Sequence, residues 1–476
     1  MLLRLNTLWL ISFQIVLALG PRAVAADRSW TVMIYGGTDS SAEEHILEPL
    51  STLRDTAADG QNGEIILLYD RTPGYTDDAT LFGENFEDTR LFRLNGGQWD
   101  RIAGGPEFSE ITLSSKYEAN TGDGHTLKKF IRSCKRNYPA KRYALILLGH
   151  GENYGVLPDM TNACPDTGEK PDFIYTAEFT EALSKEESVD FIWFDVCSFG
   201  GIENAYQLRP GNGSFSAKAM IATPPVSNTA PMRDILVNAG FVGKTEKRGP
   251  LVQSGLEFGK VAIATMRDKY RGMYAKEPGM RSECWGLYDL SYAEDVKDAV
   301  DKLARFLKVT DSRQHVEAIR GSGVTPRCMN YMREPDDPTW VNAPHFDLYD
   351  LAQRIRDAAS LDVSVRNAAS NLVKTVDLFI ADSFAGPRYE NFSDGKNGIY
   401  IIFPDGNAKI ADTRHWATFE WYHPNDRRKL SRAFGNYAWC RNGAIEGNNK
   451  VENWFELLDF WFDLHDKKGG FNKYRW

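Results

Sequence analysis

The feature that most constrains the fold is a series of short apolar runs separated by segments with helical periodicity. The clearest runs are residues 30–35 (WTVMIY), 64–70 (EIILLYD), 143–148 (YALILL) and 189–194 (VDFIWF). The segment after the first run places Ile46, Leu50 and Leu53 at helical spacing. Strands that are apolar on both faces and separated by helices are typical of a parallel sheet covered on both sides. The sequence therefore predicts an α/β/α sandwich with a mostly parallel central sheet.

The chain beyond about residue 300 has a different pattern and predicts a C-terminal accessory region. Helical periodicity recurs around residues 293–307 and 345–360, a strand is expected at 398–403, and an aromatic-rich helix at 453–464. We therefore expect an α/β/α domain over residues 26–300 and an α+β region over residues 301–476.

The first 25 residues are typical of a secretory signal peptide. Arg4 precedes an apolar stretch over residues 8–19, and Ala23 and Ala25 are small residues suited to cleavage. The stretch is too short to anchor the chain, because a membrane-spanning helix needs about 20 apolar residues. The expected location is secreted or periplasmic, with no membrane segment left after cleavage.

Charge and cysteine usage exclude some functions. The chain has 56 Lys and Arg against 65 Asp and Glu, a net charge of -9, and it lacks a concentrated basic patch. Such a chain repels a phosphate backbone, so no nucleic-acid partner is expected. The six cysteines lack metal-binding spacing, so no metal site is predicted from them.

Two reactive side chains follow strands of the predicted sheet. His150 comes after the run at 143–148, and Cys197 comes after the run at 189–194. The carboxyl ends of parallel strands share one edge of the sheet, so imidazole and thiol can meet there. Spacing alone leaves the alternative that Cys197 is a small buried residue and His150 a satisfied polar one.

The surroundings of the thiol favour a nucleophile. Residues 200–208 are expected to form a helix, and a helix N-terminus close to Cys197 favours the thiolate. Gly151 lets a backbone N–H approach a tetrahedral oxyanion, and the N–H of Cys197 can supply a second donor.

The sequence resembles the clostripain-like cysteine peptidases of the caspase-like clan over about residues 30–210. The motifs that carry the resemblance are strongest at residues 145–151 (LILLGHG) and 194–206 (FDVCSFGGIENAY), with support from residues 30–35, 69–71 and 120–123. It implies a caspase-like fold, a secreted endopeptidase that hydrolyses peptide bonds, Cys197 as nucleophile and His150 as its acid/base partner. No cofactor is required for this chemistry. Calcium is possible because the family has calcium-dependent members, but its site is not predicted. Asp39, Asp70 and Asp123 could contribute to it, but none has EF-hand spacing, so strand-end capping is the favoured role for these acids.

Specificity is less closely fixed by the resemblance. Asp195 can line the S1 pocket and pair with Arg or Lys, as its family counterpart does, or it can cap the helix after Cys197. The sequence departs from the family pattern at residues 152–155 (ENYG) and 222–227 (ATPPVS), both expected to border the substrate cleft. Two other functions stay open: an inactive extracellular binding protein on the same fold, and a transpeptidase using the same nucleophile.

Overall fold

The computed structural model describes residues 28–152, 155–165, 168, 170–321, 327–332, 344–403, 434–445 and 450–462. Its centre, within these residues, is a nine-stranded sheet of order β12-β10-β9-β8-β5-β1-β2-β3-β4. Its strands are β1 (Trp30–Gly37), β2 (Glu64–Asp70), β3 (Thr89–Asn95), β4 (Gln98–Ile102), β5 (Arg142–Gly149), β8 (Val189–Asp195), β9 (Ala217–Ala222), β10 (Cys284–Asp289) and β12 (Ile380–Ala385). The central strands β2, β1, β5, β8 and β9 are parallel, and antiparallel strands extend both edges.

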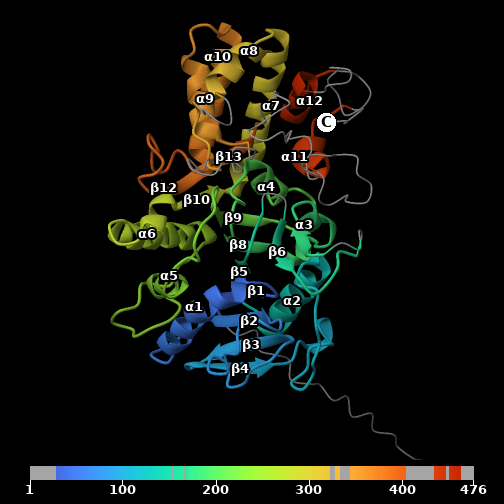
Figure 1. Ribbon diagram of the computed structural model, residues 1–476, viewed down its shortest axis with the longest axis vertical. Coiled ribbons are helices and arrows are strands. Elements are labelled where there is room, and N and C mark those ends of the chain that lie inside the picture. The colour runs from blue at the N-terminus through green and yellow to red at the C-terminus, as the bar shows by residue number, and fades with distance from the viewer. Residues whose placement is uncertain are drawn as a thin grey trace, which may run out of the picture.

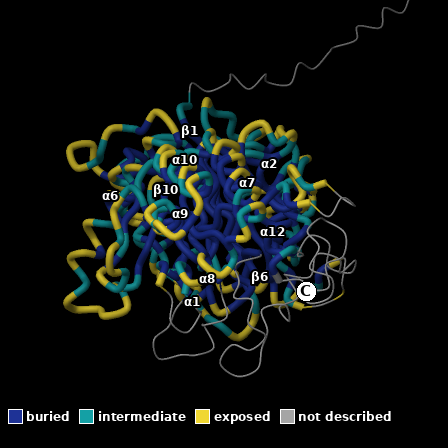
Figure 2. Tube along the Cα trace, turned by 90° about the horizontal axis from the view of Figure 1, so that it is seen from above, coloured by how far each residue is buried: buried dark blue, intermediate teal, exposed yellow. Residues whose placement is uncertain are grey.

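Alternating side chains of the central strands pack against helices on the two faces of the sheet. Val32 and Ile34 of β1 belong to the core under α1 (Ala42–Ala57), α5 (Met232–Asn238) and α6 (Gly255–Met273). Met33 and Tyr35 point to the opposite core, with α2 (Gly124–Asn137) and α3 (Glu178–Glu181). Figure 1 shows these two helical layers on opposite sides of the strands, and Figure 2 shows buried residues running through the middle of the molecule. The predicted α/β/α architecture is confirmed.

A helical extension lies beyond one edge of the sheet (Figure 1). Its elements are α7 (Ala293–Val309), α8 (Arg313–Arg320), α9 (Leu348–Asp357), α10 (Val363–Phe379), α11 (Ala438–Arg441), α12 (Trp454–Phe462) and the paired strands β11 (His345–Asp347) and β13 (Tyr400–Ile402). The short α4 (Ile202–Gln207) contacts it, and a hairpin of β6 (Gly155–Asp159) and β7 (Asp172–Tyr175) lies beside β5. Strand β12, which lies after residue 300, pairs with β10 in the central sheet. The predicted C-terminal region therefore contributes one strand to the sheet of the first domain. The division at residue 300 stays a prediction.

Local differences from the sequence prediction have clear causes. Residues 345–347 form a strand, because His345 pairs with Ile402 and its ring stacks on Tyr400 at 3.9 Å between centroids. The helix expected after Thr176 is a single turn that starts at Glu178, with Ala177 before it. The predicted signal peptide lies outside the described residues.

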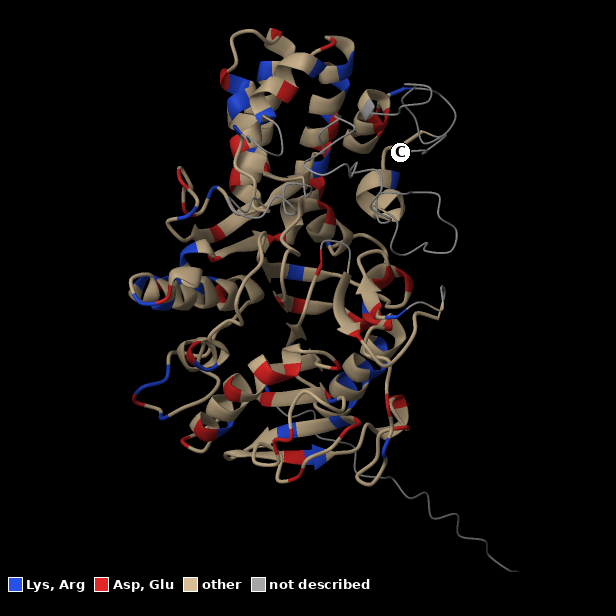
Figure 3. Ribbon diagram, in the orientation of Figure 1, with Lys and Arg blue, Asp and Glu red and all other residues tan. Residues whose placement is uncertain are grey.

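The described helices and the distribution of surface charge bear on the predicted partners. None of the helices in the described ranges has the combination of length and apolarity that crossing a bilayer requires. Lys and Arg are interspersed with Asp and Glu along most elements (Figure 3). The absence of a nucleic-acid partner stays a prediction.

Candidate active site

The two predicted reactive residues follow adjacent parallel strands at the same height. Leu148 of β5 pairs with Asp195 of β8, and His150 and Cys197 each lie two positions further along. Both line one cavity of about 540 Å³, whose other walls come from the first turns of α1 and from residues 226–229 after β9. The structure therefore brings His150 and Cys197 together at one sheet edge, as the strand pattern predicts.

Cys197 lies at a sharp turn after β8. The next residue, Ser198, has φ +57°, a conformation that non-glycine residues rarely adopt. The Cys197 Sγ lies 3.6 Å from the carbonyl oxygen of Ser227, to which the thiol can donate. Burial is the main cause that raises the pKa of the Cys197 thiol, and the nearby acids Glu152, Glu283 and Asp195 raise it further.

This corrects the expected electrostatics of the thiol. Helix α4 begins only at Ile202, after the N-cap Gly201, and it is short. A helix dipole acts within the first turn, so it reaches Cys197 weakly, and burial decides the direction of the pKa shift. The raised pKa favours the neutral thiol of Cys197 over the thiolate.

His150 is half-buried and its contact is with α1. Its Nε2 lies 2.9 Å from the Oγ of Ser41, the residue before the helix. Burial lowers the pKa of His150, and His45 on the same helix lowers it further. A neutral imidazole beside a neutral thiol can act as a general base.

Gly151 lies directly against the backbone of Cys197. A Cβ built at Gly151 would be 2.8 Å from the carbonyl oxygen of Cys197 and 2.8 Å from the Cβ of Val196. Among the described residues, the backbone N–H groups of Gly151 and Cys197 have no hydrogen-bond acceptor. A side chain at position 151 would force the backbone beside Cys197 to shift.

Asp195 lines the same cavity from the end of β8. Its residue is 3% exposed, and both carboxylate oxygens accept from the N–H of Ala230, at 3.1 and 3.3 Å. Burial raises the pKa of Asp195 to about 7, and the N–H of Ala230 opposes this. The carboxylate does not cap α4. One buried carboxylate served by one N–H retains lone pairs for a cationic ligand.

A residue of the C-terminal region holds the turn that contains Cys197 and Ser198. The sequence did not predict this contact. Tyr400 of β13 donates from its hydroxyl to the carbonyl oxygen of Ser198 at 3.0 Å, and its N–H donates to Gly200. A Cβ on Gly201 would meet the Tyr400 ring at 2.4 Å. The sequence predicted a strand here, but not its contact with Ser198, which is more than 190 positions away along the chain.

The segments that depart from the family pattern border the site in part. Val226, Ser227 and Asn228 line the cavity, and Asn228 is held by the carboxylate of Glu283, 2.7 Å from its Nδ2. Glu152 raises the pKa of Cys197 through its charge. Residues 153–154 lie outside the described residues.

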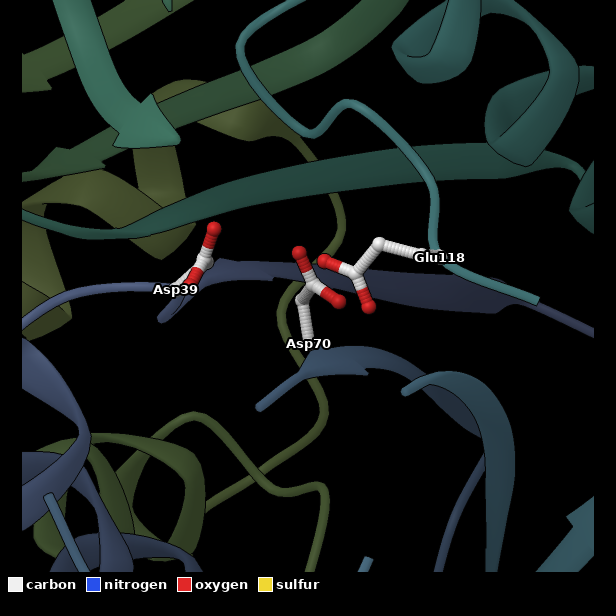
Figure 4. A group of neighbouring side chains, drawn as sticks. All are labelled: Asp39, Asp70 and Glu118. Carbon is white, nitrogen blue, oxygen red and sulfur yellow. The ribbon is translucent and has the colours of Figure 1, made fainter. Parts of the chain in front are cut away.

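A group of buried carboxylates lies at the ends of β1 and β2. Ligand atoms of Asp39, Asp70 and Glu118 all lie within 4.8 Å of one another (Figure 4). Asp159 adjoins them, because the Thr121 hydroxyl lies 3.2 Å from Asp70 Oδ2 and 3.3 Å from Asp159 Oδ2. Within the described chain, no Lys or Arg pairs with these four acids.

Burial is the main cause of the raised pKa values in this group. Burial raises the pKa of Glu118 to about 8 and that of Asp159 to about 7, and neighbouring acids add to both shifts. One oxygen of the fully buried Asp39 has no hydrogen-bond partner. Two of the acids suggested from sequence, Asp39 and Asp70, belong to the group. Asp123 instead caps α2 by accepting from the N–H of His125.

Comparison with known proteins places this arrangement in a family. The sequence profile of the Clostripain family matches residues 34–457. Clostripain of Hathewaya histolytica is 34% identical, over 94% of this chain and 89% of that protein.

Solved structures agree at the level of the fold. A secreted C11 cysteine protease from Bacteroides thetaiotaomicron, in complex with an irreversible peptide inhibitor, has a TM-score of 0.51 and 16% identity, covering 85% of this chain and 98% of that one. An inactive zymogen C11 protease from Parabacteroides distasonis has a TM-score of 0.50 and 17% identity, with the same coverage.

Proposed function

Because this chain belongs to the clostripain family and is a cysteine endopeptidase, we propose that Cys197 and His150 are its catalytic dyad and that it cleaves after Arg or Lys. The observation that carries the dyad is the placement of both side chains beyond adjacent parallel strands, on one cavity. The family assignment replaces the alternative of an inactive binding protein.

The proposed reaction starts from a neutral pair. His150 takes the thiol proton as the Cys197 sulfur attacks the scissile carbonyl, and the resulting oxyanion accepts from the N–H groups of Gly151 and Cys197. The imidazolium then donates its proton to the leaving amine as the C–N bond breaks. Water resolves the acyl-enzyme, and an added amine would give transpeptidation instead.

The S1 specificity is assigned to Asp195. Its carboxylate is buried, lines the cavity and, among the described residues, accepts from a single N–H, so an incoming guanidinium can pair with it in a bidentate geometry. Lysine would bind as a point charge, so arginine is expected to be preferred.

Profiling a peptide mixture tests the dyad. Cys197→Ala and His150→Ala should each abolish cleavage, while Cys134→Ala, which changes a buried thiol away from this cavity, should retain it. Products collected with and without added amine separate hydrolysis from transpeptidation. Cleavage by either dyad variant at the wild-type rate would refute the assignment.

We also propose that residues 1–25 direct export and are removed. The N-terminal residue of protein recovered from the culture medium or periplasm should be Ala26. Recovery only from the cytoplasm with residues 1–25 intact would refute this.

We propose that the carboxylates of Asp39, Asp70, Glu118 and Asp159 bind a structural calcium ion. The oxygen-only donor set suits a hard cation, and the unpartnered, fully buried oxygen of Asp39 provides a free ligand position. The ion would neutralise the carboxylates and tie together the ends of β1 and β2. It is assigned no step in the reaction.

Metal binding can be measured without an activity assay. Calcium added to EDTA-treated protein should raise the melting temperature, and Tb³⁺ should luminesce on excitation of nearby tyrosines such as Tyr35. Asp70→Asn should lose both effects, whereas Asp123→Asn should keep them. Equal responses in the two variants would place any ion elsewhere.

A further inference from the structure

The first turn of α1 carries a hydroxyl in contact with the proposed catalytic base. We propose that Ser41 is a positioning residue that holds His150 through Nε2 and stabilises its imidazolium form. This assignment rests on the proposed catalytic role of His150.

The local structure shows that Ser41 is not occupied as a helix cap. A serine before a helix usually accepts from an N–H of the first turn, but the Ser41 side chain makes no such bond. The neighbouring Ser40 accepts from the N–H of Ala42 instead, at 3.3 Å. The Ser41 hydroxyl is 2.9 Å from Nε2 of His150, more than 100 positions away along the chain.

The contact assigns roles to the two ring nitrogens in the charged state. Both nitrogens of an imidazolium carry protons and act only as donors. The Ser41 oxygen therefore accepts from Nε2–H, which leaves Nδ1–H as the proton that came from the thiol. As the S–C bond forms and the C–N bond breaks, that Nδ1 proton passes to the leaving amine.

The charges around His150 make such an acceptor useful. Burial and His45 lower its pKa, and the N-terminal end of α1 also disfavours a cation. The cavity that His150 lines also holds Glu48, Asp195 and Cys197, and burial raises the pKa of Asp195. Among the described residues, the Ser41 hydroxyl is the neutral acceptor in hydrogen-bond contact with the ring, so it offsets the cost of the imidazolium.

Ser41→Ala tests the proposal, with Ser41→Thr and Ser51→Ala as controls. Ser51 lies on the same helix and its hydroxyl accepts from Arg54, away from the cavity. We expect Ser41→Ala to lower kcat roughly tenfold with little change in KM, Ser41→Thr to restore it, and Ser51→Ala to match wild type.

The pH profile distinguishes positioning from a structural role. Removing an acceptor that favours the imidazolium lowers the pKa of His150, so the acid limb of kcat/KM should move to lower pH in Ser41→Ala. Asp195 titrates in both proteins, so the difference between the two profiles belongs to Ser41. Melting temperatures should agree, because the exposed hydroxyl makes no capping bond.

The outcomes separate this inference from the proposed function. Wild-type kcat and an unmoved acid limb in Ser41→Ala, with His150→Ala inactive, would overturn the role of Ser41 alone. Full activity in His150→Ala would overturn the dyad itself, and the role of Ser41 with it.

Discussion

The proposed pairing of Asp195 with a P1 arginine should depend on pH, and the burial of Asp195 sets the pH range. Its pKa is about 7, against an ordinary value of 3.8, because it lies in the protein interior. A carboxyl group of that pKa is about nine-tenths ionised at pH 8 and about one-tenth ionised at pH 6. The negative charge that pairs with a P1 arginine is therefore lost as the pH falls through 7.

The assay compares two peptides that differ only at P1, one with arginine and one with its neutral isostere citrulline. Titration of His150 and Cys197 affects both substrates and cancels in the ratio of their kcat/KM values. The ratio should fall about tenfold between pH 8 and pH 6.

Asp195→Asn provides the matched control. At pH 8 it should cost about 2 kcal/mol or more of transition-state stabilisation for the arginine peptide, which lowers kcat/KM roughly thirtyfold. The kcat/KM for the citrulline peptide should not change. Its substrate ratio should no longer vary with pH. Equal loss on both peptides, or an unchanged pH dependence, would refute the assignment of Asp195 to S1.

The same substitution should stabilise the protein. A raised carboxyl pKa means that the folded state binds a proton the unfolded state releases, so stability falls as the pH rises from about 4 to 7. Asparagine avoids burying the charge, so the free energy of unfolding at pH 8 should increase by up to about 4 kcal/mol. Chemical denaturation measures this, and a less stable variant would contradict it.

Three further predictions follow from other contacts. Gly151→Ala should lower kcat by about a hundredfold or more, because its Cβ meets the Cys197 carbonyl and displaces an oxyanion donor; wild-type kcat in burst kinetics would contradict this. Tyr400→Phe should cost about 1–3 kcal/mol of unfolding free energy by leaving the Ser198 carbonyl without its donor, as urea denaturation would detect. Without divalent cations, Asp159→Asn should raise the melting temperature at pH 8 more than at pH 5, because the raised pKa of Asp159 leaves it charged only at the higher pH.

The sequence alone determined the layered fold and the place where the site would lie. Apolar runs are local patterns, and β1, β2, β5 and β8 begin and end close to the residues that the runs indicate. The strand ends then put His150 and Cys197 at one sheet edge, because parallel neighbours present their carboxyl ends together. A His-Gly pair and an Asp-x-Cys pair at these strand ends, taken together with the family resemblance, were enough to choose the candidate dyad.

The tertiary structure decided what depends on burial and on contacts between distant segments. The thiol of Cys197 has a raised pKa because of the atoms packed around it, which no local motif reports. Ser41 contacts His150, and Tyr400 contacts Ser198, although more than 100 residues separate the partners in each pair. Local sequence patterns do not indicate contacts over such separations. Glu118 joins the acidic group for the same reason. Sequence periodicity specifies which residues form strands and helices, whereas desolvation and long-range hydrogen bonds arise only once those elements have packed.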